Sequence, residues 1–386
     1  MLNSNQSIYV HWPFCSAKCP YCDFNSHVSN KDIQMDDWIK SYKHEIQKEI
    51  EYTDNKNIQS IFFGGGTPSL MPIRIIDFIL NLLAKNYIIS NDCEITLEAN
   101  PSSAEISKFK ILSKMGINRL SIGLQSLEDK SLKFLGRNHN AYEGLQALDN
   151  AKKYYKKVSF DLIYGLPGQT EQNWEKELSR AIKMSQGHIS AYQLTIEKGT
   201  PFYAMQRDKK LNLPSDNTLL NLYKLTEKLL KEKKFKKYEV SNYALNGNEC
   251  MHNINIWKGF EYSGFGPGAH GRIKKHNFWY ENQRYSAPFL WLNKAKKKQS
   301  TSLTKKKISP NQRAKEILLT SLRLSAGADT KSIKNICKLD SLSSVIDKNS
   351  CKLLEKEKFI KINKNIIALT NKGFPLLNSI INKIII

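Results

Sequence analysis

The sequence contains few cysteines and no long apolar run. Seven cysteines are spread over 386 residues, and the three nearest the N-terminus are odd in number, so the disulfide framework of a small secreted domain is not expected. No apolar run approaches the roughly 18–20 residues that a transmembrane helix requires. The N-terminus also lacks a basic segment followed by an apolar one. The sequence therefore predicts a soluble, cytoplasmic chain with no signal peptide and no membrane-spanning segment.

Acidic residues are also scarce. The chain has 36 Asp and Glu against 59 Lys and Arg, which gives a net charge of +23, and most of the excess lies after Ser286, in lysine runs at 296–298 and 305–307. A basic tail can bind RNA or an anionic membrane face. No aromatic residues alternate with these lysines as they do in platforms that stack single-stranded bases. Because Lys, Asn and Ile are abundant throughout the chain, we favour compositional drift over a nucleic-acid partner.

Three of the cysteines form a C-x3-C-x2-C motif made of Cys15, Cys19 and Cys22. A 4Fe–4S cluster has four irons, each of which normally takes one Cys ligand. Three thiolates with no fourth nearby therefore leave one iron open to a ligand that is not protein. A zinc site is the alternative, because zinc prefers four N or S ligands and His11 or His27 could be the fourth. The spacing alone leaves both open.

Strand and helix patterns alternate from the N-terminus to about residue 195. Apolar or β-branched runs predict strands at 8–11, 60–63, 94–98, 119–123, 158–163 and 188–192. Helical patterns follow at 32–52, 72–84, 104–115, 129–135, 142–154 and 172–185. This alternation predicts an α/β fold with parallel strands and right-handed crossovers. About six β/α units are too few for a closed barrel of eight.

Polar residues stand where these predicted strands end. His11, Glu98, Gln125, Asp161 and Gln193 all occupy such positions. In parallel barrels the chemistry lies at the C-terminal ends of the strands. We therefore expect these side chains and the cysteine motif to share one site.

Taken together, these motifs resemble the radical S-adenosylmethionine (SAM) family. The resemblance rests on the cysteine spacing, on Tyr21 just before the last Cys, and on the Gly-Gly-Gly-Thr-Pro segment at 64–68 behind the next strand. It implies an open partial (β/α)6 barrel. In that family the open iron chelates SAM, and one electron from the cluster cleaves the sulfonium to give a 5′-deoxyadenosyl radical.

The resemblance also implies which residues contact SAM. Gly65, Gly66 and Thr67 would hold the methionyl amino group, since glycine allows a close backbone approach. Tyr9 would line the methionine moiety, and Tyr21 belongs to the cysteine loop itself.

Four further polar residues would contact the rest of SAM. Glu98 would accept the ribose hydroxyls, as acidic residues do in dinucleotide folds. Gln125 would contact the ribose region and Asp161 the nucleoside. Arg137 would pair with the SAM carboxylate, for which a guanidinium fork is well suited.

Within the family, the order of motifs resembles one branch, which contains oxygen-independent coproporphyrinogen III dehydrogenase and the HemW-type haem chaperone. The dehydrogenase carries a fourth Cys two positions after the third, where this chain has Phe24. The chaperone carries an HNxxYW motif, which corresponds to 252–257 here with Ile256 in place of Tyr. The resemblance therefore implies a haem chaperone, with the decarboxylating dehydrogenase of haem biosynthesis as the alternative.

His252 is the expected haem ligand, because imidazole is a common axial ligand for haem iron. Cys250 is its rival. The cofactors implied are a 4Fe–4S cluster, SAM and haem. The implied partner is a haem-receiving protein at the inner face of the cytoplasmic membrane.

The domain organisation follows from these segments. We expect a radical SAM partial barrel over 1–212 and a barrel extension with the haem-binding segment over 213–292. A basic linker over 293–309 and a small α+β, winged-helix-like domain over 310–386 would complete the chain.

Overall fold

Parallel strands form the centre of the main sheet in this computed structural model, which describes residues 6–28, 33–54 and 56–386. Their order is β1-β4-β5-β6-β7-β8, and each pairs with the next in parallel. The bounds are β1 Gln6–Trp12, β4 Asn57–Gly65, β5 Ile88–Ala99, β6 Arg119–Gln125, β7 Lys157–Tyr164 and β8 His188–Gln193. The predicted open (β/α)6 barrel is confirmed.

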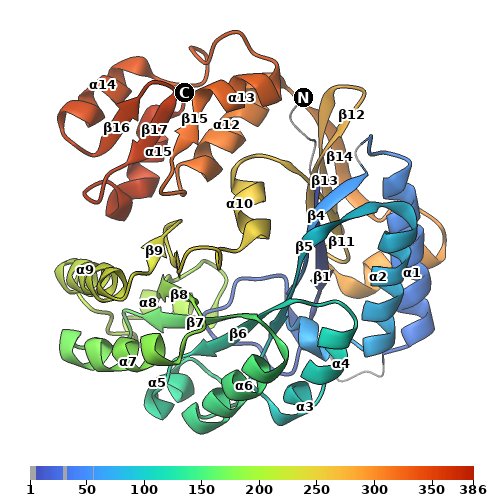
Figure 1. Cartoon of the computed structure of the whole chain (residues 1–386), viewed down its shortest axis with the longest axis horizontal. Coiled ribbons are helices and arrows are strands. Elements are labelled where there is room, and N and C mark those ends of the chain that lie inside the picture. The colour runs from blue at the N-terminus through green and yellow to red at the C-terminus, as the bar shows by residue number, and fades with distance from the viewer. Residues whose placement is uncertain (1–5, 29–32, 55) are drawn as a thin grey trace.

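Helices follow these strands and cover the outside of the sheet (Figure 1). They are α1 Met35–Ile50, α2 Ile73–Asn86, α3 Ser103–Ile106, α4 Phe109–Lys114, α5 Asp129–Phe134, α6 Ala141–Tyr154 and α7 Glu171–Met184. The single helix expected over 104–115 is thus two short ones. The expected helix start at Asp32 and the N-terminal residues 1–5 lie outside the described residues.

The main sheet continues past the barrel on both sides. Beside β1 lie β11 Glu261–Phe265, β12 His270–Lys275, β13 Phe278–Arg284 and β14 Ser302–Ile308. Beside β8 lie β10 Asn242–Ala244 and β9 Lys236–Lys237. The remaining helices of this part are α8 Pro201–Arg207, α9 Asp216–Glu232, α10 Met251–Trp257 and α11 Pro288–Lys296.

The segment 293–309, expected to be a basic linker, is ordered secondary structure instead. It contains the end of α11 and all of β14, which pairs with β13. Two lysines of β14 pair with acidic residues on neighbouring elements: Lys306 with Glu281 at 2.9 Å and Lys305 with Glu49 at 3.6 Å. These ion pairs stabilise the lysines of β14, which is the edge strand of the sheet.

The C-terminal unit has the element order expected of a winged-helix-like module. It consists of α12 Pro310–Ser321, β15 Ala328–Asp329, α13 Thr330–Cys337, α14 Lys348–Lys356, β16 Ile360–Asn363, β17 Ile366–Leu369 and α15 Leu377–Ile384. Its sheet has the order β15-β17-β16. The unit lies over α10 (Figure 1), where the hydroxyls of Thr320 and Ser321 donate to the backbone oxygen of Trp257.

The hydrophobic core lies between the sheet and its covering helices. Trp12, Trp38 and Trp291 are among the fully buried side chains. Trp38 contacts Trp12 in a tilted arrangement, with ring centres 5.1 Å apart, and stacks on Trp291 at 5.4 Å. None of the described helices combines the length and the apolar character needed to cross a membrane.

Candidate functional site

A cavity of about 570 Å³ opens at the C-terminal ends of the parallel strands. The residues that follow β1, and the last residues of β4, β5, β6, β7 and β8, all contribute to its wall, as expected for a parallel barrel. The predicted residues that line it are Cys15, Cys19, Tyr21, Cys22, Gly65, Gly66, Thr67, Glu98, Gln125, Arg137 and Asp161. The structure therefore brings most of the sequence-predicted site together.

The three cysteines are held in one loop after β1. Cys15 lies on the short strand β2 Phe14–Cys15, which pairs in parallel with β3 His27–Val28. The backbone amide of Cys22 donates to the oxygen of Cys19 at 3.1 Å, which closes the turn between them. All three side chains face the same cavity.

Two of the three thiols accept hydrogen bonds from different side chains. Thr67 Oγ1 donates to Cys15 Sγ at 3.4 Å, and Arg137 Nη1 donates to Cys19 Sγ at 3.4 Å. Burial raises the pKa of Cys15, while the Thr67 hydroxyl works in the opposite direction. Donors aimed at sulfur stabilise thiolates, which are the form that binds metal.

The donor set fits an iron–sulfur cluster better than zinc. Both ring nitrogens of His11 are engaged, Nδ1 with the Tyr9 hydroxyl at 3.0 Å and Nε2 with the Asn25 oxygen at 2.9 Å. His27 Nε2 contacts Asn25 Oδ1 at 3.1 Å. Within the described residues, no group of three His, Cys, Asp or Glu is placed to hold a metal ion. The cysteines of a cluster bind different irons and need not meet at one point.

The glycine segment at the end of β4 is tied to the cysteine loop by its backbone. Gly66 N donates to Trp12 O at 2.7 Å, and Thr67 N donates to Phe14 O at 2.9 Å. Gly65 has φ of +118°, and a Cβ there would lie 2.7 Å from the ring of His11. A Cβ on Gly66 would lie 2.8 Å from Phe14 O. Glycine is therefore required here, because this segment packs closely against the end of β1 and the cysteine loop.

Arg137 is one of the cations that line the cavity. Its Nη2 donates to Asn100 Oδ1 at 2.5 Å and to Gly123 O at 2.9 Å. Its Nε is buried and has no hydrogen-bond partner among the described residues. A buried, unpaired donor is costly, so this atom favours an anionic ligand group beside it.

Asn100 is a site residue that the sequence analysis did not identify. Besides accepting from Arg137, it donates from Nδ2 to Thr67 Oγ1 at 2.9 Å. It thus links the arginine to the glycine segment across the cavity. Its position, two residues after Glu98 and directly before Pro101, was the available signal.

Glu98 and Asp161 are the two carboxylates predicted from the sequence that line the cavity. Burial and the nearby Asp161 charge raise the pKa of Glu98 to about 8, against a hydrogen bond from the Gly65 backbone. Burial raises the pKa of Asp161 to about 6, although the Ser190 hydroxyl lowers it. Two carboxylates in one enclosed space resist ionisation together. A ligand that brings hydroxyl donors or positive charge would favour their ionised forms.

Gln125 and Tyr9, both predicted to contact SAM, differ in their position relative to the cavity. Gln125 lines the cavity with φ of +69°, a left-handed conformation that is strained for a residue other than glycine. Tyr9 does not line the cavity; its hydroxyl contacts His11 Nδ1, and its ring lies 6.4 Å from that of His252. Tyr9 is therefore connected to the cysteine loop through His11.

His252 lies apart from the cavity. It is buried on α10, where its Nδ1 contacts Ser60 Oγ at 3.0 Å and its ring stacks on Phe62 at 4.9 Å. Burial lowers the pKa of the imidazole to about 3. Its Nε2 is buried without a partner among the described residues. Cys250 is also buried, and burial raises its pKa to about 12.

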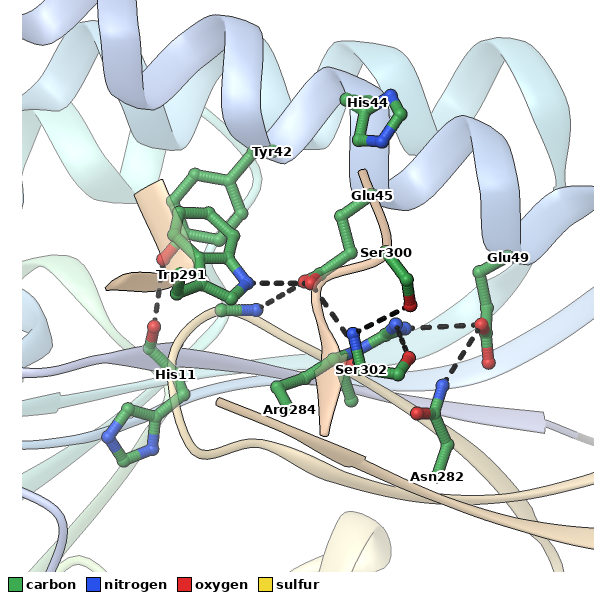
Figure 2. Close-up of polar contacts among 12 residues, drawn as sticks. His11, Tyr42, His44, Glu45, Glu49, Asn282, Arg284, Trp291, Ser300 and Ser302 are labelled. Atoms are coloured by element: carbon green, nitrogen blue, oxygen red, sulfur yellow. Dashed lines mark hydrogen bonds and ion pairs between the residues drawn. The ribbon is translucent and has the colours of Figure 1, made fainter. Parts of the chain in front are cut away.

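A polar network behind the cysteine loop fixes its position (Figure 2). Tyr42 donates to His11 O at 2.8 Å, and Glu45 accepts from Gly266 N and from Trp291 Nε1, each at 2.7 Å. Arg284 pairs with Glu45 at 3.4 Å and with Glu49 at 3.1 Å.

The turn held by Glu45 also contacts the cysteine loop directly. Asn25 Nδ2 donates to Pro267 O and to Ser286 O, each at 3.0 Å. A Cβ on Gly268 would lie 2.2 Å from that same nitrogen. The loop that presents the three thiols is therefore supported from the turn between β11 and β12 and from the segment between β13 and α11, as well as from the barrel.

Comparisons with known proteins agree with this geometry. The sequence profile of the Radical SAM superfamily matches residues 9–181. The chain is 33% identical over 386 residues to radical S-adenosyl methionine domain-containing protein 1, mitochondrial, of Danio rerio, covering 98% of this chain and 87% of that protein. It is 41% identical over 271 residues to the heme chaperone HemW of Buchnera aphidicola subsp. Schizaphis graminum, covering 70% and 71%.

Two further matches extend the comparison. The heme chaperone HemW of Escherichia coli is 37% identical over 268 residues, covering 69% of this chain and 70% of that protein. Among solved structures, coproporphyrinogen III oxidase (HemN) from Escherichia coli, a radical SAM enzyme, aligns with a TM-score of 0.81 and 21% identity. That alignment covers 99% of this chain and 90% of that one, and it bears on the fold.

Proposed function

Because the chain belongs to the HemW-type branch of the radical SAM family, we propose that it is a haem chaperone that carries a SAM-chelated 4Fe–4S cluster. In this role it binds haem and delivers it to haem-dependent proteins. The proposal rests on the presence of Phe24 and on the sequence identity of 41% and 37% to two proteins named heme chaperone. Phe24 lines the cavity mouth, 62% exposed, at the position where the dehydrogenase branch has its fourth Cys.

The proposed binding of the cluster and SAM assigns a task to each part of the cavity. Cys15, Cys19 and Cys22 hold three irons, and the cluster with SAM supplies one-electron chemistry when both are bound. Gly65 and Gly66 leave room for the methionyl group. Arg137 faces the SAM carboxylate with its unpaired Nε.

Ribose binding falls to the two carboxylates in this proposal. Glu98 on β5 and Asp161 on β7 lie on either side of β6, and both line the cavity. In their ionised forms they accept hydrogen bonds from the ribose and nucleoside and favour the nearby sulfonium charge. Gln125, held in its left-handed conformation, contributes an amide to the same region.

The haem ligand in this proposal is His252, through Nε2. That nitrogen is the free one, since Nδ1 contacts Ser60. Because the side chain is only 2% exposed, ligation requires α10 to move away from β4. Cys250, also buried, is the control for the rival ligand.

The haem recipient in this proposal is a protein at the inner face of the cytoplasmic membrane. The net charge of +23 supports an approach to an anionic surface. Nucleic acid is not proposed as a partner.

Anaerobic reconstitution with two parallel assays tests the function. We expect the reconstituted protein to develop a Soret band with haem and to release no carbon dioxide from coproporphyrinogen III in the presence of SAM and an electron donor. His252→Ala should shift the Soret band or lower haem occupancy, and Cys250→Ala should not. Ile256→Tyr, which restores the chaperone motif, should strengthen binding.

The opposite results have clear meanings. Carbon dioxide release from coproporphyrinogen III would establish the dehydrogenase in place of the chaperone. If the protein neither binds haem nor decarboxylates coproporphyrinogen III, both functions are rejected.

A further inference from the structure

Three residues of the cavity wall have no role in the proposed SAM contacts. Two are partly exposed aromatic residues, Phe24 at 62% and Tyr192 at 39% exposure. Exposed aromatic rings beside a cavity favour an apolar, planar ligand. The third is Arg323, which comes from the C-terminal unit rather than from the barrel.

Arg323 is placed at the cavity by a backbone contact between the C-terminal unit and the barrel. It follows α12, and the next residue, Leu324, forms an antiparallel bridge with Glu239. Ser325 N donates to Tyr238 O at 3.0 Å. These backbone contacts fix the position from which the Arg323 side chain projects. The fold therefore sets the direction of its guanidinium.

The guanidinium has donors to spare. Its Nη2 pairs with Glu239 Oε2 at 3.3 Å, and no other hydrogen bond to this group is found among the described residues. The arginine side chain is 36% exposed. Glu239 is buried and its Oε1 accepts from Ser241 N at 2.8 Å and from Asn242 Nδ2 at 2.5 Å. Because this carboxylate has other donors, Arg323 can turn to a second anion.

Arg323 also lies beside the helix that carries His252. Its guanidinium carbon is 5.8 Å from the ring centre of Trp257, the last residue of α10. A planar ligand at this end of the cavity would therefore meet both the exposed rings and the cation. Two acidic residues, Asp23 and Glu197, also line the cavity. An anionic ligand is therefore selected by where its negative charge lies relative to Arg323, and not by the net charge of the ligand.

We propose that Arg323 binds a carboxylate of a planar tetrapyrrole where the C-terminal unit lines the cavity, so that this unit selects ligands by their propionate groups. This inference rests on the proposed haem-binding function and holds whichever residue ligates the iron. A guanidinium is suited to it, because its fork binds a carboxylate through two parallel hydrogen bonds.

The test compares haem with its dimethyl ester, which has the same macrocycle and iron but no free carboxylate. Affinities are measured by Soret titration of the cluster-loaded full chain. We expect wild-type protein to prefer haem over the ester roughly ten- to hundred-fold, the range of one charge-assisted contact. Arg323→Gln should abolish most of that preference by weakening haem alone.

Three variants make the result specific. Arg207→Gln removes an exposed arginine that pairs with Asp208 and should keep the wild-type preference. Arg323→Lys keeps the charge without the fork and should give an intermediate value. Glu239→Gln removes the competing anion and should increase the preference. Unchanged cluster absorption and SAM affinity show that each variant is folded.

The possible failures can be told apart. If wild-type protein binds neither haem nor the ester, the proposed function itself is rejected. If it binds both equally, or if Arg323→Gln keeps the full preference for haem, the role of Arg323 is rejected and the chaperone proposal stands.

Discussion

Arg137 joins three parts of the cavity through one side chain. It donates to Cys19 Sγ, Asn100 Oδ1 and Gly123 O, and its Nε remains unpaired. If Nε and its neighbours meet the SAM carboxylate, Arg137→Ala should weaken SAM binding by about 1.5–3 kcal/mol, or roughly ten- to hundred-fold. Calorimetric titration with SAM measures this.

The cluster serves as the internal control for that variant. Arg137→Ala should keep its cluster absorption, whereas the triple Ala variant of Cys15, Cys19 and Cys22 should lose it. Arg180, which is exposed and pairs with Glu128, provides the matched arginine, and Arg180→Ala should bind SAM normally. Unchanged SAM affinity in Arg137→Ala would show that the assigned contact is wrong.

The two cavity carboxylates predict a pH dependence of SAM binding. The pKa of Asp161 is raised to about 6 and that of Glu98 to about 8, so both are largely protonated in acid. Protonated carboxyls are poorer acceptors and lack the charge that favours a sulfonium. SAM affinity should therefore rise from about pH 5.5 to about pH 8.5, the window that spans both pKa values. Glu98→Gln should flatten the upper part of this rise.

Stability of the SAM-free protein should change in the opposite direction. A carboxyl whose pKa is raised by folding holds its proton more tightly than in the unfolded chain, where Glu has a pKa of about 4.3. Its stabilising contribution is full below that value and is lost as the pH rises toward about 8. A melting temperature that increases over this range in wild type relative to Glu98→Gln would contradict the assignment.

At the scale of elements, α1 is joined to β13 by a buried ionic network. Arg284 is 5% exposed and pairs with Glu45 and Glu49, which are 0% and 2% exposed. Arg284→Met would leave two buried carboxylates without their principal cation, and breaking such a pair costs about 3–5 kcal/mol. Chemical denaturation should show a loss of that size.

A surface pair gives the contrast. Arg74 and Asp36 are 65% and 67% exposed at 3.1 Å, and exposed pairs contribute about 0–1 kcal/mol. Arg74→Ala should therefore have little effect. Equal losses in the Arg74 and Arg284 variants would mean that burial does not set the strength of the Arg284 pairs.

The alternation of elements in the barrel could be predicted because burial leaves a clear pattern in the sequence. The strand expected at 119–123 is β6 Arg119–Gln125, for example, and the helix expected at 142–154 is α6 Ala141–Tyr154. By contrast, β14 Ser302–Ile308 contains three consecutive lysines. Its pairing depends on acidic side chains far away in the sequence, such as Glu49 and Glu281, which no local pattern indicates.

The residues of the site, like the elements of the fold, could be predicted in part from the sequence. Residues in motifs at strand ends meet at the cavity, because parallel strands place their C-terminal ends together. The burial of His252 could not be foreseen, since α10 is short and its orientation depends on contacts with Ser60 and Phe62 of β4. The contribution of Arg323 was also hidden, because it depends on how the C-terminal unit docks.

At the scale of the whole molecule, the lysine-rich runs are partly engaged by the fold. Lys296 pairs with Asp37 at 2.8 Å and Lys306 with Glu281 at 2.9 Å. Lys305 lies 3.2 Å from the ring centre of Tyr52, and Lys307 lies 3.2 Å from that of Phe278. These contacts give the runs a structural task within the sheet extension.

The support of the cysteine loop from Pro267 and Ser286 also sets the order of events during synthesis on the ribosome. Asn25 and Ser286 are separated by 261 residues, and translation at about 5–20 residues per second needs tens of seconds to cover that distance. Strand β1 likewise lacks its neighbour β11 until residue 265 has emerged. Through most of its elongation, the nascent chain therefore lacks part of the support of the loop that carries the three thiols. That loop reaches its complete set of contacts only after the sheet has closed around the first strand.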